Sequence, residues 1–212
     1  AWLESLRLRT LPLACASIIS GSALAWHQGH FDPAIAFLAL LTTTLLQILS
    51  NLANDYGDAL KGSDTPERIG PLRGMQKGVI SKAQMRVALI ATVIITIASG
   101  MLLLLRACRS PGDFIGFLAL GGLAIVAAIA YTVGKKPYGY LGLGDLSVMI
   151  FFGWLGVLGS SYLQTHHIDM LMLLPASGCG LLATAVLNIN NLRDIDTDRK
   201  NGKFTLAVRL GA

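Results

Sequence analysis

Six long apolar segments constrain the fold of this chain more than any other feature of its sequence. A helix needs about 20 residues to cross a hydrocarbon layer of about 30 Å. Hydrophobic residues make up 53% of the 212 residues and charged residues only 14%, which is too apolar for a soluble domain of this size. We therefore predict an all-α, polytopic transmembrane helix bundle with six spans, at residues 11–27, 34–54, 84–105, 113–133, 143–163 and 169–190.

The distribution of basic residues predicts how this bundle is oriented. If the N-terminus is cytoplasmic, 15 of the 17 Lys and Arg residues fall on the cytoplasmic side, and only Arg106 and Arg109 fall on the other side. Cytoplasmic loops of membrane proteins carry such an excess. We therefore interpret the formal net charge of +5 as a topology signal, and we expect no nucleic-acid partner.

Aromatic residues near the predicted span ends form a second group. Trp and Tyr are enriched where a membrane protein passes through the lipid headgroups. We interpret six residues as such a belt: Trp2, Trp26, Trp154, Tyr138, Tyr140 and Tyr162.

The first polar motif lies where the second span enters a long cytoplasmic loop. It comprises Asn51, Asn54, Asp55, Asp58 and, further on, Asp64. On a helix, residues three or four apart share one face. Asn54 and Asp58 are therefore expected side by side, with Asp55 next to Asp58.

The second polar motif lies at the end of the sixth span. Asn190, Asp194 and Asp198 follow one another in steps of four and would form a stripe on one helix face if the helix continues. Asn190 and Asp194 lie 136 residues after Asn54 and Asp58, which indicates a weak internal repeat.

Carboxylate and amide oxygens in these two motifs suggest a shared chemistry. Mg²⁺ binds to one or two protein oxygens and completes its coordination with water and substrate phosphate. Two facing clusters would thus hold Mg²⁺ around a diphosphate and neutralise it as a leaving group. The alternative is that these residues cap helix ends and pair with nearby Arg and Lys. Acids beside membrane spans are costly and usually functional, which favours the metal–diphosphate interpretation.

Basic residues near the motifs are candidates for binding phosphate. Arg68, Arg73 and Lys77 lie in the long loop, and they would bind the diphosphate, an acidic acceptor or anionic lipid headgroups. Arg7, before the first span, is either a topology anchor or a substrate contact.

Tyr131 and Lys135 lie four residues apart at the cytoplasmic end of the fourth span. On a continuous helix they would share a face, and Lys135 would neutralise phosphate oxygens. The alternative is a belt tyrosine beside a lysine that extends towards the interface.

Three stretches resemble the signatures of the UbiA-type intramembrane aromatic prenyltransferases: NDYGD at 54–58, YTVGK at 131–135 and NNLRDIDTD at 190–198. Within this family, QILSNLANDYGDALKGSD, RIGPLRGMQKGVIS and LNINNLRDIDTDRKNGKFTLAVRLG are similar to the menaquinone branch. The family fold is a bundle of nine helices around a central cavity that opens to the cytoplasmic face. The resemblance thus implies a single transmembrane domain over residues 1–212, truncated at its C-terminus.

The resemblance also implies an activity. Members of this branch transfer a polyprenyl chain from polyprenyl diphosphate to 1,4-dihydroxy-2-naphthoate, with loss of CO₂ and diphosphate, to give demethylmenaquinone. The expected setting is the bacterial cytoplasmic (inner) membrane, with the lipid bilayer as partner, Mg²⁺ as cofactor and the active site facing the cytoplasm.

The functional residues carried over from the family fall into three groups. The implied metal ligands are Asn54, Asp55, Asp58, Asp64, Asn190, Asp194 and Asp198. Those implied for catalysis are Asp58, Asp194, Asp198 and Tyr131. Those implied for substrate binding are Lys135, Arg68, Arg73, Lys77, Arg7, Asn51 and Asn191. The chain departs from the family where the first motif often has a third Asp, because Gly62 stands four residues after Asp58.

Other functions remain open at this point. The aromatic acceptor can be of the 4-hydroxybenzoate type. A transporter would carry its coupling acids near the bilayer midplane, whereas the acids here crowd one side; a structural subunit would leave both motifs unexplained. The general base is either an Asp or the substrate itself, and the sequence indicates no oligomeric state.

Overall fold

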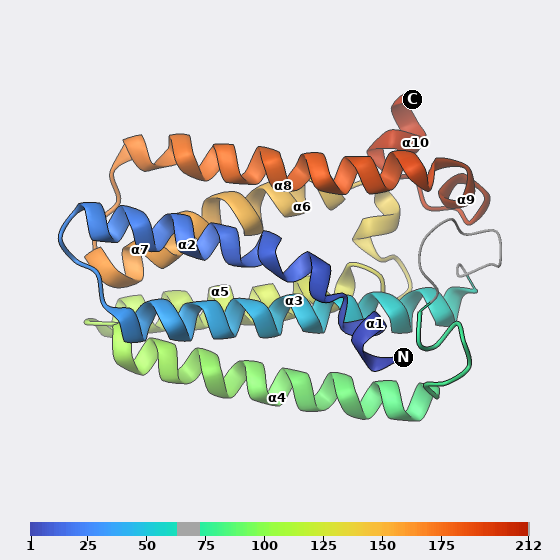
Figure 1. Ribbon diagram of the computed structural model, residues 1–212, viewed down its shortest axis with the longest axis horizontal. Coiled ribbons are helices and arrows are strands. Elements are labelled where there is room, and N and C mark those ends of the chain that lie inside the picture. Colours follow the sequence, from blue (N-terminus) through green and yellow to red (C-terminus); the bar gives the residue numbers. More distant parts are fainter. Residues whose placement is uncertain (63–72, 212) are drawn as a thin grey trace.

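The computed structural model describes residues 1–62 and 73–211, and all regular structure within them is helical (Figure 1). Six segments are long and apolar enough to cross a bilayer: Trp2–His27, Pro33–Lys61, Lys82–Ala107, Pro111–Ala130, Gly144–Thr165 and Met170–Arg193. The prediction of an all-α bundle with six spans is confirmed, and the chain is a multi-pass membrane protein. The span ends differ from the predicted ones by several residues, mainly because helices continue past the apolar runs.

The described elements follow one another along the chain, and the longest connection joins α3 to α4. In order they are α1 (Trp2–Leu6), η1 (Leu8–Thr10), α2 (Leu11–His27), α3 (Pro33–Lys61), α4 (Lys82–Ala107), α5 (Pro111–Ala130), η2 (Tyr138–Leu141), α6 (Gly144–Val148), the π-helical η3 (Met149–Leu155), α7 (Gly156–Thr165), η4 (Met170–Met172), α8 (Leu173–Arg193), α9 (Ile195–Lys200) and α10 (Leu206–Leu210).

Local sequence sets the starts of the long helices. The side chains of Asp32, Ser81 and Ser110 accept hydrogen bonds from the first backbone amides of α3, α4 and α5. Such N-caps satisfy amides that have no partner within the helix. Pro33 and Pro111 occupy first-turn positions of α3 and α5, where a missing N–H costs nothing.

Small residues let the central helices approach closely. A Cβ on Gly21 of α2 would lie 2.3 Å from the Val157 carbonyl oxygen of α7, and a Cβ on Gly153 would lie 2.8 Å from the Ala176 carbonyl oxygen of α8. Backbone contact through small residues is the usual way that membrane helices pack. The large apolar side chains of the outer faces, by contrast, are exposed towards the surrounding lipid, as on α4 at Val87, Ile90, Ile94 and Ile97.

The fifth span is not a regular α-helix. It begins with α6, widens into a π-helix at residues 149–155 and continues as α7. Trp154 lies at the middle of this span, where its indole nitrogen donates to Ser177 Oγ at 3.1 Å. Its assignment to an interfacial belt is therefore wrong, because Trp154 lies far from both ends of the span.

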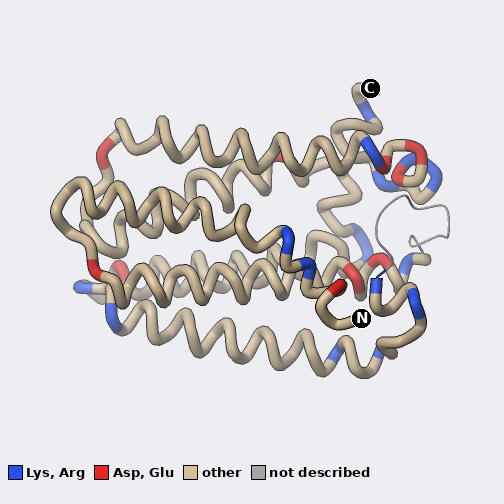
Figure 2. Tube along the Cα trace, in the orientation of Figure 1, with Lys and Arg blue, Asp and Glu red and all other residues tan. Residues whose placement is uncertain are grey.

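Most of the charged residues that the structure describes lie at one end of the bundle (Figure 2). This end contains the N-terminus, the last turns of α3 and α8, and helices α9 and α10 (Figure 1). Both polar motifs therefore lie at the same end, although more than 100 residues separate them in sequence.

Candidate active site

Helix α3 continues without a break through Asn51, Asn54, Asp55 and Asp58 of the first motif. It ends at Lys61, and Gly62 caps it with a φ of 68°, in the left-handed region that glycine adopts without strain. Asp55 is fully buried, and Asp58 is partly buried one turn from Asn54. The predicted helical placement of Asn54, Asp55 and Asp58 is confirmed.

Two arginines from distant parts of the chain neutralise the acids of this motif. Asp55 Oδ1 accepts from Arg7 Nη2 at 3.2 Å and lies 3.2 Å from Arg73 Nε. Arg73 Nη1 donates to Asp58 Oδ2 at 2.5 Å. One guanidinium thus bridges both acids, and it is only 7% exposed. Buried charges require such pairing.

Hydrogen bonds from α3 fix the N-terminal segment so that the Arg7 side chain contacts Asp55. Arg7 has a φ of 49°, and this left-handed turn separates α1 from η1. Non-glycine residues in this region are strained and cluster at functional sites. Asn51 Nδ2 donates to the Leu6 carbonyl oxygen at 2.9 Å, and it lies 3.0 Å from Thr10 Oγ1. The structure therefore gives Asn51, predicted as a substrate contact, the role of anchoring the segment that carries Arg7.

The end of α5 packs directly against the first motif. Thr132 Oγ1 lies 3.0 Å from both the Ala53 carbonyl oxygen and Asn54 Oδ1. A Cβ on Gly57 would lie 2.7 Å from the Thr132 carbonyl oxygen, so glycine is required for this approach. Sequence reasoning missed Thr132, although it lies inside the YTVGK stretch.

The expected helical pairing of Tyr131 with Lys135 is wrong. Helix α5 ends at Ala130, and residues 131–136 form turns that include Gly134 with a φ of 119°. Lys135 is exposed, whereas Tyr131 turns towards the bundle and meets Tyr138 edge to face at 5.2 Å. The glycine at position 134 permits a conformation that a continuing helix does not allow.

Tyr140 joins the first motif to the chain that follows the second. Its hydroxyl donates to Asp58 Oδ1 at 2.9 Å, and Lys61 Nζ lies 3.9 Å from its ring centroid. Its carbonyl oxygen accepts from the Phe204 amide at 3.0 Å. The assignment of Tyr140 to the interfacial belt is therefore wrong, because its hydroxyl is a partner of a motif acid.

The second motif is not one continuous helical stripe. Helix α8 ends at Arg193, and Asp194 stands at the junction with α9. Asp198 N still donates to the Asp194 carbonyl oxygen at 2.8 Å, so these two acids remain one turn apart. Asn190 is exposed and its amide donates to the Val186 carbonyl oxygen at 3.0 Å. The Asp194 carboxylate accepts two hydrogen bonds from Arg193, at 2.7 and 2.6 Å.

Asp198 provides the link between the motifs. It is 8% exposed, and Lys203 Nζ lies 3.3 Å from both of its carboxylate oxygens. Burial raises the pKa of Asp198; the negative charges of Asp194 and Asp58 add to the rise, and Lys203 opposes it. The acids of the two motifs therefore act on one another electrostatically, as expected for two sides of one site. Lys203 is a further residue that the sequence analysis did not single out.

The oxygen donors present fit a magnesium ion that is shared with a substrate. Asp55 Oδ2 is buried without a hydrogen-bond partner among the described residues, and buried Asp198 Oδ2 has the Lys203 ammonium 3.3 Å away. No three His, Cys, Asp or Glu side chains within residues 1–62 and 73–211 gather into a metal cage. Mg²⁺ commonly takes only one or two carboxylates and fills its other positions with water and phosphate oxygens.

The remaining predicted site residues divide into three cases. Asn191 is buried near the end of α8. Lys77 is exposed and pairs with Glu4 at 2.7 Å, so it ties the loop to α1. Asp64 and Arg68 lie outside the described residues.

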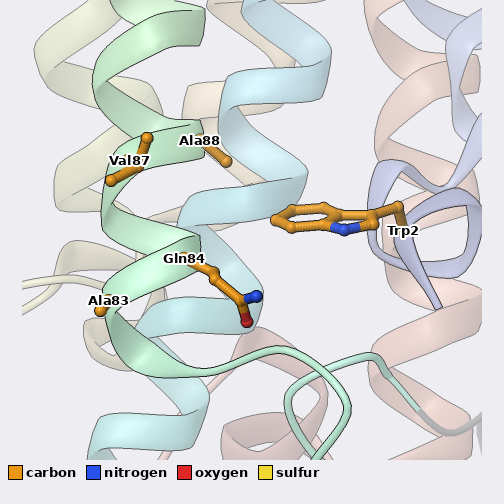
Figure 3. A pocket seen from close by; sticks show the side chains of 5 residues that line it. All are labelled: Trp2, Ala83, Gln84, Val87 and Ala88. Atoms are coloured by element: carbon orange, nitrogen blue, oxygen red, sulfur yellow. The ribbon is translucent and has the colours of Figure 1, made fainter.

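An open groove at the same end of the bundle has a different chemistry (Figure 3). It lies between α1 and the first turns of α4 and is lined by Trp2, Ala83, Gln84, Val87 and Ala88. The Gln84 side-chain oxygen already accepts from the Ser81 amide at 2.8 Å, within the cap of α4. The groove thus suits an acyl chain and has no cation for a diphosphate.

Comparison with known proteins gives a consistent picture. The UbiA prenyltransferase family matches residues 14–212. The 1,4-dihydroxy-2-naphthoate octaprenyltransferase of Escherichia coli strain K12 is 69% identical over 211 residues, which are 100% of this chain and 68% of that protein. The Haemophilus influenzae protein of the same name is 61% identical over 100% of this chain and 69% of its own length. That of Mycobacterium tuberculosis is 39% identical over 99% of this chain and 70% of its own length.

Proposed function

Because the chain belongs to the UbiA prenyltransferase family, we propose that it transfers an octaprenyl chain from its diphosphate to 1,4-dihydroxy-2-naphthoate. The products are CO₂, diphosphate and demethylmenaquinone. The observation that carries the proposal is that acids of both motifs lie at one end of an apolar bundle: Asp55 and Asp198 are buried, Asp58 is partly buried, and Asp55 Oδ2 has no hydrogen-bond partner among the described residues. The identity of 69% to a naphthoate octaprenyltransferase supports this acceptor.

The charged end of the bundle is where the diphosphate would bind. Bound Mg²⁺ would neutralise the leaving diphosphate, and the residues that would hold it are Asn54, Asp55, Asp58, Asp64, Asn190, Asp194 and Asp198. Three cations form ion pairs with acids of this set: Arg7 and Arg73 with Asp55, and Lys203 with Asp198. The same cations would stabilise negative charge on the phosphate oxygens.

The reaction breaks the allylic C–O bond, and the electron pair leaves with the diphosphate. The ring carbon that bears the carboxylate then forms the new C–C bond, and CO₂ departs leaving its electron pair to restore the aromatic ring. No proton has to leave that carbon. The bundle below the charged end excludes water from the allylic cation, because its interior is apolar.

We also infer the orientation in the membrane. Fifteen of the 17 Lys and Arg residues fall in the sequence segments predicted to be cytoplasmic, which supports a cytoplasmic N-terminus and an active site that faces the cytoplasm. Bacterial relatives support the inner membrane as the location.

Acceptor choice is tested with the full-length protein in membranes from a host that lacks the endogenous activity. Octaprenyl diphosphate and Mg²⁺ are supplied with either dihydroxynaphthoate or 4-hydroxybenzoate, and lipid products are identified by mass. We expect a prenylated naphthoquinol with loss of CO₂, and no product when a chelator removes Mg²⁺. Product from 4-hydroxybenzoate and none from the naphthoate would refute the acceptor assignment.

A further inference from the structure

Asp145 is a partly buried acid that belongs to neither motif. It lies in the first turn of α6, where the fifth span begins. Its Oδ1 atom is buried and has no hydrogen-bond partner among the described residues. A buried carboxylate oxygen without a donor costs free energy, so a ligand that donates to it would relieve that cost.

Three elements meet around Asp145. A Cβ on the preceding Gly144 would lie 2.9 Å from Tyr131 Oη and 3.4 Å from Leu187 Cδ2, so the start of α6 touches both the end of α5 and α8. Thr184 of α8 lies ten residues before Asp194, which corresponds to about 15 Å along a helix. Thr184 Oγ1 approaches the Asp145 carbonyl oxygen at 3.5 Å. Asp145 therefore lies deeper in the bundle than the second motif.

Two hydroxyl donors on the neighbouring segments, those of Tyr138 and Thr184, are occupied elsewhere. Tyr138 Oη lies 2.9 Å from the Ala127 carbonyl oxygen and 3.1 Å from Ser147 Oγ. Thr184 points its hydroxyl at the Asp145 backbone and not at the carboxylate. The orphan oxygen is thus left for a donor that is not one of these side chains.

Tyr131 connects Asp145 to the diphosphate end. Burial raises the pKa of the Tyr131 hydroxyl, and the charges of Asp145, Asp58 and Asp198 contribute to the rise. Acids from α3, α6 and α9 therefore lie within electrostatic range of one tyrosine. Because Tyr131 Oη lies beside Gly144, an aromatic ring that packs against Tyr131 would lie near Asp145.

We propose that Asp145 accepts a hydrogen bond from a ring hydroxyl of the aromatic acceptor and so positions the ring for attack. The proposal rests on the proposed function, which makes the acceptor a dihydroxy aromatic acid. An ionised carboxylate only accepts hydrogen bonds, so it binds a phenol and repels the acceptor's own carboxylate. This repulsion turns the acceptor's carboxylate away from Asp145. The proton stays on the hydroxyl, and its partial transfer towards Asp145 makes the ring more nucleophilic.

A purely structural role makes a different prediction. An acid in the first turn of a helix interacts favourably with the helix dipole. If this were its role, removing it would lower the stability of the protein without a selective loss of affinity for the acceptor. The test therefore compares the two substrates in the full-length protein, using Asp145→Asn and Asp145→Leu, with Asp169→Asn as control. Asp169 is exposed at the opposite end of the bundle and caps η4, a role that asparagine can also fill.

We expect the KM for dihydroxynaphthoate to rise about tenfold in Asp145→Asn and more in Asp145→Leu, as loss of a hydrogen bond to a charged group predicts. The KM for octaprenyl diphosphate should change less than about twofold, and Asp169→Asn should match the wild type. Acceptors with one hydroxyl methylated provide a second readout, since a methyl ether cannot donate. One of the two methyl ethers should bind to the wild type more weakly than the unmethylated acceptor does. In Asp145→Asn the same ether should bind as well as the unmethylated acceptor.

Equal changes in both KM values, or an unchanged KM for the acceptor, would overturn the proposal. So would a methyl ether penalty of the same size in wild type and variant. If the wild type accepts only another phenolic acid, the proposed function fails. The same comparison made with that phenol then still decides the role of Asp145.

Discussion

Replacing Arg73 with lysine tests whether one guanidinium joins the two acids of the first motif. Arg73 contacts Asp55 through Nε at 3.2 Å and Asp58 through Nη1 at 2.5 Å. Lysine carries a single nitrogen and cannot reproduce this fork. The Arg73→Lys variant keeps the positive charge and loses one of the two contacts.

The size of the stability loss in Arg73→Lys follows from the burial of Asp55. Asp55 is 0% exposed, so water does not replace a lost donor. A hydrogen bond to a charged group contributes about 1.5–3 kcal/mol, and for a domain of this size each kcal/mol shifts the melting temperature by about 2–4 °C. We therefore expect a melting temperature lower by about 3–12 °C. The kcat/KM for the diphosphate donor should fall by about 10- to 100-fold.

Both quantities are measured in detergent-solubilised full-length protein, by thermal unfolding and by steady-state turnover at saturating acceptor. Arg86→Lys is the matched control, because Arg86 is exposed on α4 at the same end of the bundle. An Arg73→Lys variant with the stability and donor kinetics of Arg86→Lys would refute the bridging role.

Two further perturbations probe packing and protonation. Gly57→Ala places a Cβ 2.7 Å from the Thr132 carbonyl oxygen and should destabilise the protein by about 1–3 kcal/mol. Gly116→Ala is the control, because its Cβ enters open space and should not destabilise the protein. Equal melting temperatures of the two variants would contradict the close approach of Gly57 to Thr132. Because the pKa of Asp198 is raised, this carboxylate takes up its proton at a higher pH than an ordinary aspartate. Affinity for Mg²⁺ should therefore fall as pH drops from about 7.5 to about 5. Mg²⁺ titrations of turnover measure this fall, which should be smaller in Asp198→Asn; a wild-type affinity that does not change with pH would contradict it.

The sequence predicted the fold class because membrane helices carry their signal in composition and length. Six apolar runs and the basic residues around them sufficed to predict six spans. The first motif was placed correctly on a helix, since Asn54, Asp55 and Asp58 continue the pattern of α3 without a breaking residue.

What the sequence did not predict depends on contacts between distant segments. Tyr140 looks like a belt tyrosine until Asp58, 82 residues away, accepts its hydroxyl. The stripe of the second motif requires an unbroken helix, and the break at Asp194 leaves no clear mark in residue spacing. Asp145 passed unnoticed because a single acid at a span end has no motif, and only burial of its oxygen distinguishes it.

The central claim is that both motifs form one diphosphate site, and a double-mutant cycle tests it most directly. Mg²⁺-dependent binding of octaprenyl diphosphate is measured for the wild type, Asp58→Asn, Asp194→Asn and the double variant, with folding checked by thermal unfolding. Residues that act in one site show non-additive effects, so we predict that each single variant loses most of the Mg²⁺-dependent affinity and that the double variant loses little more. Losses that multiply, or a single variant that keeps wild-type affinity, would contradict a shared site.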